Sequence, residues 1–134
     1  MDNLQPLLQP LRILIADDHA LIRELLTSFL DTVEGMVVVG EASNGQHAVD
    51  LCQRLAPDLV LMDLEMPGMN GITATSTITS ATPFIRVVVL TASFSPEQRL
   101  AAFQAGASAF LLKSELIDTL IQTIYQVVDV PVRE

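Results

Sequence analysis

The sequence predicts an α/β fold, a doubly wound parallel sheet of five strands with five helices on its two faces. Two observations lead to this prediction. Five apolar runs of four or five residues recur along the chain without alternation, which is typical of strands buried on both faces. Segments with helical spacing of apolar residues lie between them. Strand and helix therefore alternate, and right-handed crossovers then build a parallel sheet.

Five predicted strands alternate with helical segments along the chain. The predicted strands are 13–16, 36–39, 59–62, 87–90 and 109–112. Helical spacing is found in three sets of residues: Leu21, Ile22, Leu25, Leu26, Phe29 and Leu30; Ala48, Leu51, Cys52 and Leu55; and Ile117, Leu120, Ile121, Ile124 and Val128. Ser95 followed by Pro96 and Gln98 indicates the start of another helix. The pattern supports the helix in 72–80 least, because this segment is rich in Thr and Ser.

Composition excludes several functional classes. The 134 residues suit one domain, and seven basic against sixteen acidic residues give a net charge of −9. Such a surface repels phosphate backbones and anionic lipids, so we expect neither direct nucleic-acid binding nor membrane binding. Cys52 has no disulfide partner, and two histidines are too few for a zinc cluster. The uncharged segment 66–85 is broken by Pro and Gly, and the N-terminus has no secretory pattern, so we expect a cytoplasmic protein.

Polar residues follow four of the predicted strands. They are Asp17, Asp18 and His19 after the first, Asp63 and Glu65 after the third, Thr91 after the fourth and Lys113 after the fifth. Parallel strands end at one edge, where ligands bind at the point at which strand order reverses. Each residue also has an ordinary explanation: a helix cap or dipole partner, a turn residue, a strand end or a surface cation.

Taken together, these residues indicate a binding site. Crowded carboxylates destabilise a fold unless a cation offsets them, and Mg²⁺ suits one or two carboxylates, water and phosphate oxygens. Lys113 is the only lysine, whereas the other six basic residues are arginines. A compact ammonium at this position suits a phosphoryl oxygen.

At these positions the sequence resembles the receiver domain of two-component response regulators. The segments IADDHALIRELL, VVVGEASNGQHAV, PDLVLMDLEMPGMNGI and AGASAFLLKS are most similar to the NarL/FixJ (LuxR-type) branch. The resemblance covers 12–129, with 1–11 as an N-terminal arm and 130–134 as the start of a linker or C-terminal tail. It implies a flavodoxin-like sheet with strand order 2-1-3-4-5.

The resemblance assigns a role to each matching residue. Asp63 would accept a phosphoryl group from a sensor histidine kinase. The Asp18 and Asp63 side chains and the Glu65 main-chain carbonyl would hold Mg²⁺, and Asp17 would contact the ion through water. The chain would then be a signalling switch in a phosphorelay, not a turnover enzyme.

The same resemblance implies how the switch works. Thr91 and Lys113 would bind the phosphoryl oxygens, and movement of Thr91 would let Phe110 turn, changing the surface of the fourth helix, fifth strand and fifth helix. The ordinary alternative for Phe110 is a core aromatic.

The resemblance and the fifth helix lead to predictions for the output and the oligomeric state. In this branch a helix-turn-helix domain usually follows the receiver and controls transcription; this chain is too short to include one, so it is either part of a longer protein or a stand-alone receiver. The fifth helix presents an uncharged face of Thr119, Gln122, Thr123 and Gln126 near Tyr125, from which we predict a homodimer through the fifth and first helices.

Three rival functions share parts of this pattern. A pseudo-receiver would bind partners without phosphorylation. A Mg²⁺-dependent aspartyl phosphatase of the haloacid dehalogenase type needs its nucleophile after the first strand and a second aspartate two residues on. Here Asp63 follows the third strand, and Glu65 occupies the place of the second aspartate. In a flavodoxin, Asp17 and Asp18 would repel the flavin phosphate.

Overall fold

The computed structural model describes residues 9–128, and within them five strands alternate with five α-helices. The strands are β1 (Leu11–Ala16), β2 (Met36–Ala42), β3 (Leu59–Asp63), β4 (Arg86–Thr91) and β5 (Ala109–Leu112). The helices are α1 (Ala20–Asp31), α2 (Gly45–Leu55), α3 (Gly71–Ala81), α4 (Pro96–Gln104) and α5 (Leu116–Val128), with a short 3-10 helix, η2 (Lys113–Glu115), before α5. No helix in the described part of the chain is long and apolar enough to cross a membrane.

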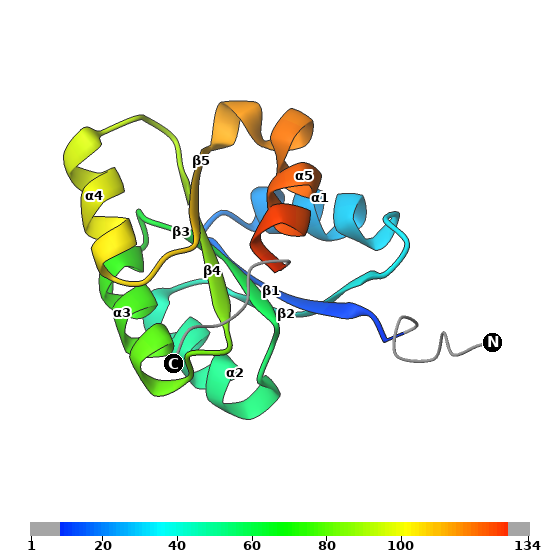
Figure 1. Cartoon of the computed structure of the whole chain (residues 1–134), viewed down its shortest axis with the longest axis horizontal. Coiled ribbons are helices and arrows are strands. Elements are labelled where there is room, and N and C mark those ends of the chain that lie inside the picture. Colours follow the sequence, from blue (N-terminus) through cyan, green and yellow to red (C-terminus); the bar gives the residue numbers. More distant parts are fainter. Residues whose placement is uncertain (1–8, 129–134) are drawn as a thin grey trace.

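The strands form one parallel sheet in the order β2-β1-β3-β4-β5 (Figure 1). This confirms the predicted sheet and its flavodoxin-like strand order. The chain moves outward from β1 to β2 and then crosses to β3 on the other side of β1. Strand order therefore reverses between β1 and β3, which is where a doubly wound sheet binds its ligands.

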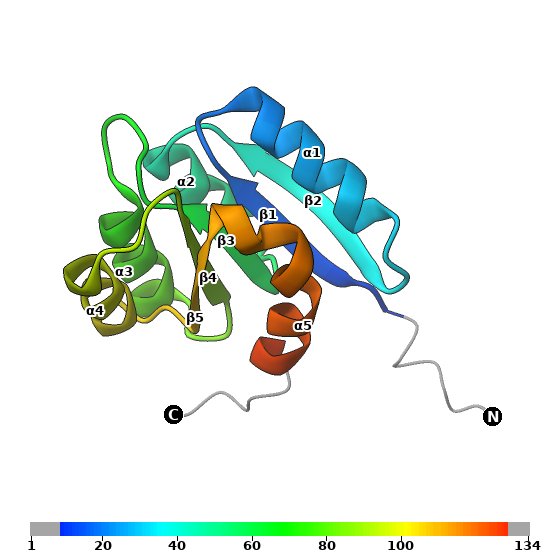
Figure 2. The same ribbon diagram turned by 90° about the horizontal axis from the view of Figure 1, so that it is seen from above.

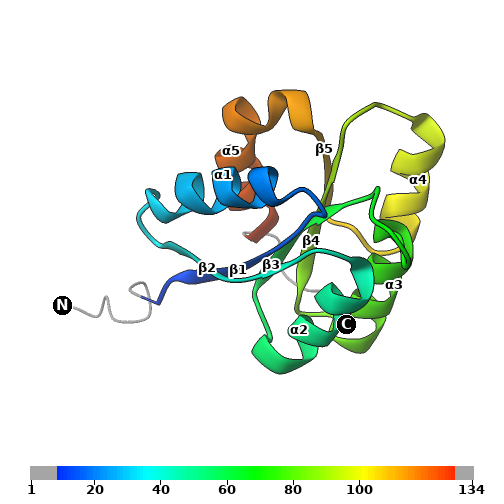
Figure 3. The same cartoon turned by 180° about the vertical axis from the view of Figure 1, so that it is seen from behind.

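Helices cover both faces of the sheet. In Figures 1 and 3, α1 and α5 lie on one side and α2, α3 and α4 on the other. Figure 2 shows the same arrangement from above. Along β1, Ile13 and Ile15 pack with residues of α1 and α5, while Leu14 and Ala16 pack with residues of α2, α3 and α4. Because both faces are buried, the strands have no hydrophobic alternation.

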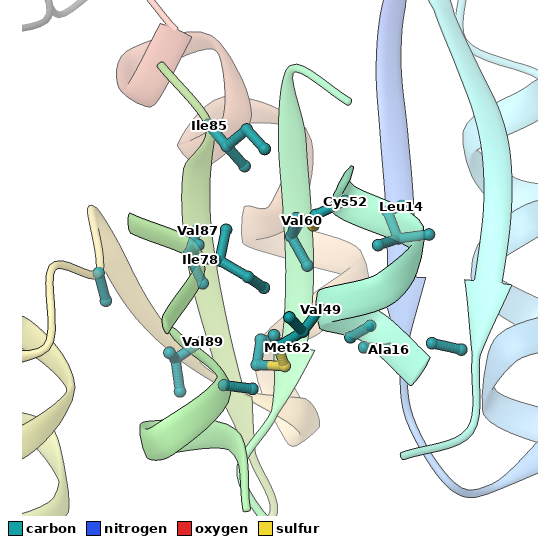
Figure 4. Close-up of a cluster of buried hydrophobic side chains, with 14 of the residues drawn as sticks. Leu14, Ala16, Val49, Cys52, Val60, Met62, Ile78, Ile85, Val87 and Val89 are labelled. Atoms are coloured by element: carbon teal, nitrogen blue, oxygen red, sulfur yellow. The ribbon is translucent and has the colours of Figure 1, made fainter. Parts of the chain in front are cut away.

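The core beneath α2, α3 and α4 is built mainly from aliphatic side chains (Figure 4). Val60 and Met62 on β3 and Val87 and Val89 on β4 are fully buried, and Val49 of α2 packs in the same cluster. Branched and flexible apolar side chains fill such an interior closely. The central strands that end at the candidate site are therefore held firmly from this side.

Four of the five strands are longer than the predicted apolar runs, and β1 and β2 are extended most. β1 begins at Leu11, the last residue of the predicted arm, and β2 continues through Gly40 and Glu41 to Ala42. These residues pair with β1 after an irregularity between Ile13 and Leu14. Backbone pairing, not side-chain polarity, sets the ends of these strands. Residues 1–8 of the predicted arm and the predicted tail 130–134 lie outside the described residues.

A cap and buried apolar residues explain how helix α3 forms from a sequence rich in Thr and Ser. The Asn70 side chain accepts from the Thr73 N–H at 2.9 Å and caps the helix. The Thr77 and Thr79 hydroxyls donate to carbonyls four residues earlier, at 2.9 and 3.0 Å. These hydroxyls are satisfied on their own helix, and the burial of Ala74 and Ile78 against the core outweighs the weak propensity of the segment. At α4, Ser95 caps the helix as predicted, accepting from the Gln98 N–H at 3.2 Å.

Two helices bury only part of their predicted apolar sets. In α1, Leu26 and Leu30 are buried, whereas Leu21 and Leu25 are 76% and 52% exposed. In α5, Ile117 is 52% exposed, although its spacing predicted a core position. A helix lying on a sheet buries a limited stripe, so apolar sets as wide as these leave residues on the outer surface.

Candidate functional site

Four strands have polar residues at or just beyond their carboxyl ends, at one edge of the sheet. Asp63 and Thr91 are the last residues of β3 and β4, while Asp17 and Lys113 directly follow β1 and β5. The exposed fractions of Asp17, Asp63 and Thr91 are 0%, 2% and 0%. This edge includes the switch point between β1 and β3, so buried polar groups collect where such a fold binds ligands.

Lys113 joins two of these buried carboxylates. Its Nζ lies 2.7 Å from Asp17 Oδ2 and 3.4 Å from Asp63 Oδ1. The lysine side chain is only 17% exposed. One compact cation therefore offsets two carboxylates that have little access to water.

The environment changes the protonation of both Asp63 and Lys113. Burial raises the pKa of Asp63, and the charge of Asp17 raises it further, whereas Lys113 and the Glu65 N–H, at 3.3 Å from Asp63 Oδ1, oppose this effect without cancelling it. Burial lowers the pKa of Lys113, but the close contact with Asp17 and the charge of Asp63 outweigh burial and raise the pKa overall. Lys113 is therefore held charged, and ionised Asp63 would be stabilised by a further cation.

The acidic residues form a cluster of suitable size for a metal ion. Asp17, Asp18, His19 and Asp63 each offer one ligand atom, and these atoms lie within 4.8 Å of one another. Asp63 Oδ2 is buried and has no hydrogen-bond partner among the described residues, and Asp17 Oδ2 has its Lys113 ion pair but no partner with hydrogen-bond geometry. Oxygen donors of this kind fit Mg²⁺. The contribution of the Glu65 main-chain carbonyl stays a prediction.

Sequence reasoning assigned no role to two residues that organise the loop after β1, His19 and Arg23. His19 Nδ1 lies 3.1 Å from both Asp17 Oδ1 and Asp18 Oδ1. Arg23 Nη1 donates to the Asp17 carbonyl at 2.7 Å, and its Nε pairs with Glu41 Oε1 at 3.1 Å. The position of His19 directly after two aspartates was a usable signal, whereas the contact between Arg23 and β2 depends on the tertiary fold.

Gly71 lets the start of α3 approach the end of β3. A Cβ atom at this position would lie 2.2 Å from the Asp63 carbonyl oxygen and 2.8 Å from the Leu64 Cα. No side chain fits at these distances. Glycine is therefore required for the close approach that fixes the backbone of Asp63.

Thr91 and Phe110 lie on the same face of the sheet. Phe110 is opposite Val89 in the register of β4 and β5, and Thr91 is opposite Leu112, two positions farther along. Thr91 Oγ1 donates to the Ser93 carbonyl at 3.1 Å. Phe110 is partly buried against the core beneath α3 and α4, and does not belong to the acidic cluster. The two residues predicted to form a switch are thus neighbours on adjacent strands.

This combination of fold and site defines a class of protein. A doubly wound sheet with acids after β1 and β3, a hydroxyl at the end of β4 and a lysine after β5 is the arrangement expected of a receiver domain. Residues 13–125 match the family model of the response regulator receiver domain. The chain belongs to this family, whose members act generally as signalling switches in two-component systems.

Curated relatives support the predicted branch. The response regulator GacA of Pseudomonas aeruginosa is 38% identical over 117 residues, which are 87% of this chain and 55% of GacA. The nitrate/nitrite response regulator NarL of Escherichia coli K12 is 36% identical over 118 residues, 88% of this chain and 55% of NarL. The predicted resemblance to the NarL/FixJ branch is confirmed, and the chain spans about half the length of these relatives.

Solved structures share the fold. A LuxR-family two-component response regulator from Aurantimonas sp. SI85-9A1 has a TM-score of 0.86 and 34% identity, with 90% of this chain and 86% of that chain covered. The CheX–CheY–BeF₃–Mg²⁺ complex from Borrelia burgdorferi contains a chain with a TM-score of 0.83 and 27% identity, with 89% and 90% covered.

Proposed function

We propose that this chain is a phosphorylation-dependent switch in which Asp63 accepts a phosphoryl group from a sensor histidine kinase. The observation that carries the proposal is the setting of the Asp63 carboxylate. It lies at the end of a central strand, 3.4 Å from Lys113 Nζ, with Oδ2 lacking a hydrogen-bond partner among the described residues. One oxygen is thus associated with a cation while the other is left for chemistry.

The transfer needs positioning and charge neutralisation. An Asp63 oxygen attacks phosphorus, the bond from phosphorus to the histidine nitrogen of the kinase breaks, and that nitrogen keeps the electron pair. Lys113 offsets negative charge on the phosphoryl oxygens, and the Thr91 hydroxyl donates to one of them after leaving the Ser93 carbonyl. A Mg²⁺ ion held by the Asp18 and Asp63 side chains and the Glu65 carbonyl, with Asp17 contacting it through water, would supply further charge neutralisation. The Mg²⁺ in the related CheY complex supports this assignment.

The same contacts suggest how the signal spreads. When Thr91 turns toward the phosphoryl group, space opens on its face of the sheet, and Phe110 on the neighbouring strand turns inward. This changes the surface formed by α4, β5 and α5. Phosphorylation can shift the equilibrium between the two arrangements of Thr91 and Phe110 only by as much as it stabilises one of them more than the other.

A homodimer through α1 and α5 would give the switch an output. The two helices cover the same face of the sheet, and Leu21, Leu25, Ile117 and Tyr125 expose between 49% and 76% of their surface there. The predicted polar face is only partly available, because Thr119 and Thr123 are half-buried while Gln122 and Gln126 are exposed. The exposed apolar residues therefore give the proposed interface its main attraction.

Sedimentation with Mg²⁺ and the phosphoryl mimic BeF₃⁻ tests this interface. We expect dimerisation of the wild type, loss of the dimer in Ile117→Glu, and no loss in the control Leu100→Glu, which changes an exposed residue of α4. A monomer at all concentrations in both states would remove the dimer from the proposal. Control of transcription through a further domain and the cytoplasmic location stay predictions.

Phosphoryl transfer itself is tested by intact-mass analysis after incubation with acetyl phosphate, with and without Mg²⁺. The wild type should gain one phosphoryl group only with Mg²⁺. Asp63→Asn should gain none, and Asp50→Asn, which changes an exposed acid on α2, should behave as the wild type. If the wild type gains no phosphoryl group from acetyl phosphate and none from the histidine kinase, the result would support the pseudo-receiver instead.

A further inference from the structure

His19 lies beside the acidic cluster in an orientation that the helix does not require. It is the N-cap residue of α1, but its side chain makes no capping hydrogen bond to the helix. The imidazole instead faces the carboxylates of Asp17 and Asp18. The His19 backbone N–H also donates to Asp17 Oδ1 at 2.8 Å, which fixes the residue against the cluster.

The distances fit donors that share one ion. His19 Nδ1 lies 3.1 Å from Asp17 Oδ1 and 3.1 Å from Asp18 Oδ1. Two donors at right angles around an ion, each about 2.1 Å from it, are roughly 3.0 Å apart. Asp63 completes the group, since one ligand atom from each of the four residues lies within 4.8 Å of the others.

A second observation is that one buried carboxylate oxygen of this cluster lacks a partner. Asp63 is only 2% exposed, and its Oδ2 atom has no hydrogen-bond partner among the described residues. Lys113 approaches the other oxygen of Asp63 and Oδ2 of Asp17. Lys113 therefore contacts one oxygen of each of these two carboxylates. His19 contacts the other oxygen of Asp17, Oδ1.

We propose that His19 is a direct metal ligand through Nδ1, and that it gives the pocket a preference for divalent ions that accept imidazole, such as Co²⁺, over Mg²⁺. This inference rests on the cation site in the proposed function. Carboxylate and water donors suit Mg²⁺, whereas imidazole suits ions later in the first transition row. A site with three carboxylates and one imidazole binds Mg²⁺ through its oxygens and gains affinity for Co²⁺ through its nitrogen.

Metal titration on the whole chain tests this preference. Affinities for Co²⁺ and Mg²⁺ are measured by calorimetry on the wild type, His19→Gln and His47→Gln; His47 is an exposed histidine on α2 and serves as the matched control. We expect the ratio of Co²⁺ to Mg²⁺ affinity to fall at least about tenfold in His19→Gln. The ratio should not change in His47→Gln.

Proton NMR of the Co²⁺-loaded protein detects the ligand directly. The Nε2–H proton of a ligated His19 should give an exchangeable resonance shifted far outside the normal range, present in the wild type and His47→Gln and lost in His19→Gln. Circular dichroism confirms that the variants are folded.

The outcomes separate the inference from the proposed function. Equal loss of Mg²⁺ and Co²⁺ affinity in His19→Gln, without a shifted imidazole resonance in the wild type, would mean that His19 only orders the carboxylates and would overturn the inference. Metal binding that is unchanged in His19→Gln would overturn it as well, while leaving the Mg²⁺ site intact. Failure of the wild type to bind either ion would overturn both.

Discussion

Replacing Lys113 with methionine tests how the fold tolerates two buried carboxylates at the strand ends. Methionine keeps an apolar stem and removes the charge. With Nζ at 2.7 Å from Asp17 and 3.4 Å from Asp63, the gross attractions are about 6 and about 5 kcal/mol at an effective dielectric constant of about 20. The cost of burying the lysine, with its side chain only 17% exposed, cancels much of this attraction.

The net loss follows from what the substitution leaves behind. Removing one partner of a buried ion pair costs about 3–5 kcal/mol, because a buried charge is left uncompensated. We therefore expect Lys113→Met to lower the free energy of unfolding by about 3–5 kcal/mol at pH 7 without divalent ions. A domain whose stability is about 10 kcal/mol, the middle of the usual range, remains folded after such a loss.

Urea unfolding followed by circular dichroism measures this loss, with the exposed Arg54→Met on α2 as a control that should cost less than about 1 kcal/mol. The cost should shrink as the pH falls through the raised pKa of Asp63, because its carboxylate then takes up a proton. Adding Asp63→Asn to Lys113→Met should recover part of the stability. A cost below about 1 kcal/mol, or one that does not change with pH, would refute this electrostatic account.

Three further substitutions test other parts of the structure. Asp63→Asn should raise the free energy of unfolding at pH 7. Because the pKa of Asp63 is raised in the fold, the wild type is stabilised when Asp63 is protonated, and it loses this stabilisation as the pH rises through the raised pKa. The advantage of the variant over the wild type in urea unfolding should therefore vanish toward pH 4, where Asp63 becomes protonated in both the folded and the unfolded wild type. Gly71→Ala should cost about 1–3 kcal/mol or more and reduce labelling by acetyl phosphate, because its Cβ would meet the Asp63 carbonyl; unchanged stability and labelling would contradict the close approach. Leu120→Ala, at a fully buried position of α5, should cost about 2–5 kcal/mol in thermal or urea unfolding, while the exposed Leu21→Ala should stay within about 0.5 kcal/mol, and equal effects would contradict the packing.

The fold was predictable because strands buried on both faces leave a distinctive pattern. All five apolar runs lie within observed strands, and the resemblance supplied their order. The ends of the strands were less predictable. Gly40 and Glu41 belong to β2 because they pair with Leu14 and Ile15 of β1, a contact that hydropathy does not encode.

The candidate site was predictable to the extent that topology determines it. Asp17, Asp63 and Lys113 come together because they follow parallel strands, and the ion pairs connect them. Side-chain direction was not predictable in the same way. The orientation of His19 depends on how α1 starts. Ile117 is exposed because Leu116, Leu120 and Ile124 take the buried positions of α5.

Chemical mapping of the phosphorylated residue tests the central claim most directly. An acyl phosphate formed from acetyl phosphate and Mg²⁺ is reduced with borohydride, which converts the modified aspartate to homoserine, and peptide mass spectrometry then locates the change. We predict homoserine at Asp63, with Asp17, Asp18 and the exposed Asp50 unmodified. Homoserine at Asp17 or Asp18 in place of Asp63 would contradict the account.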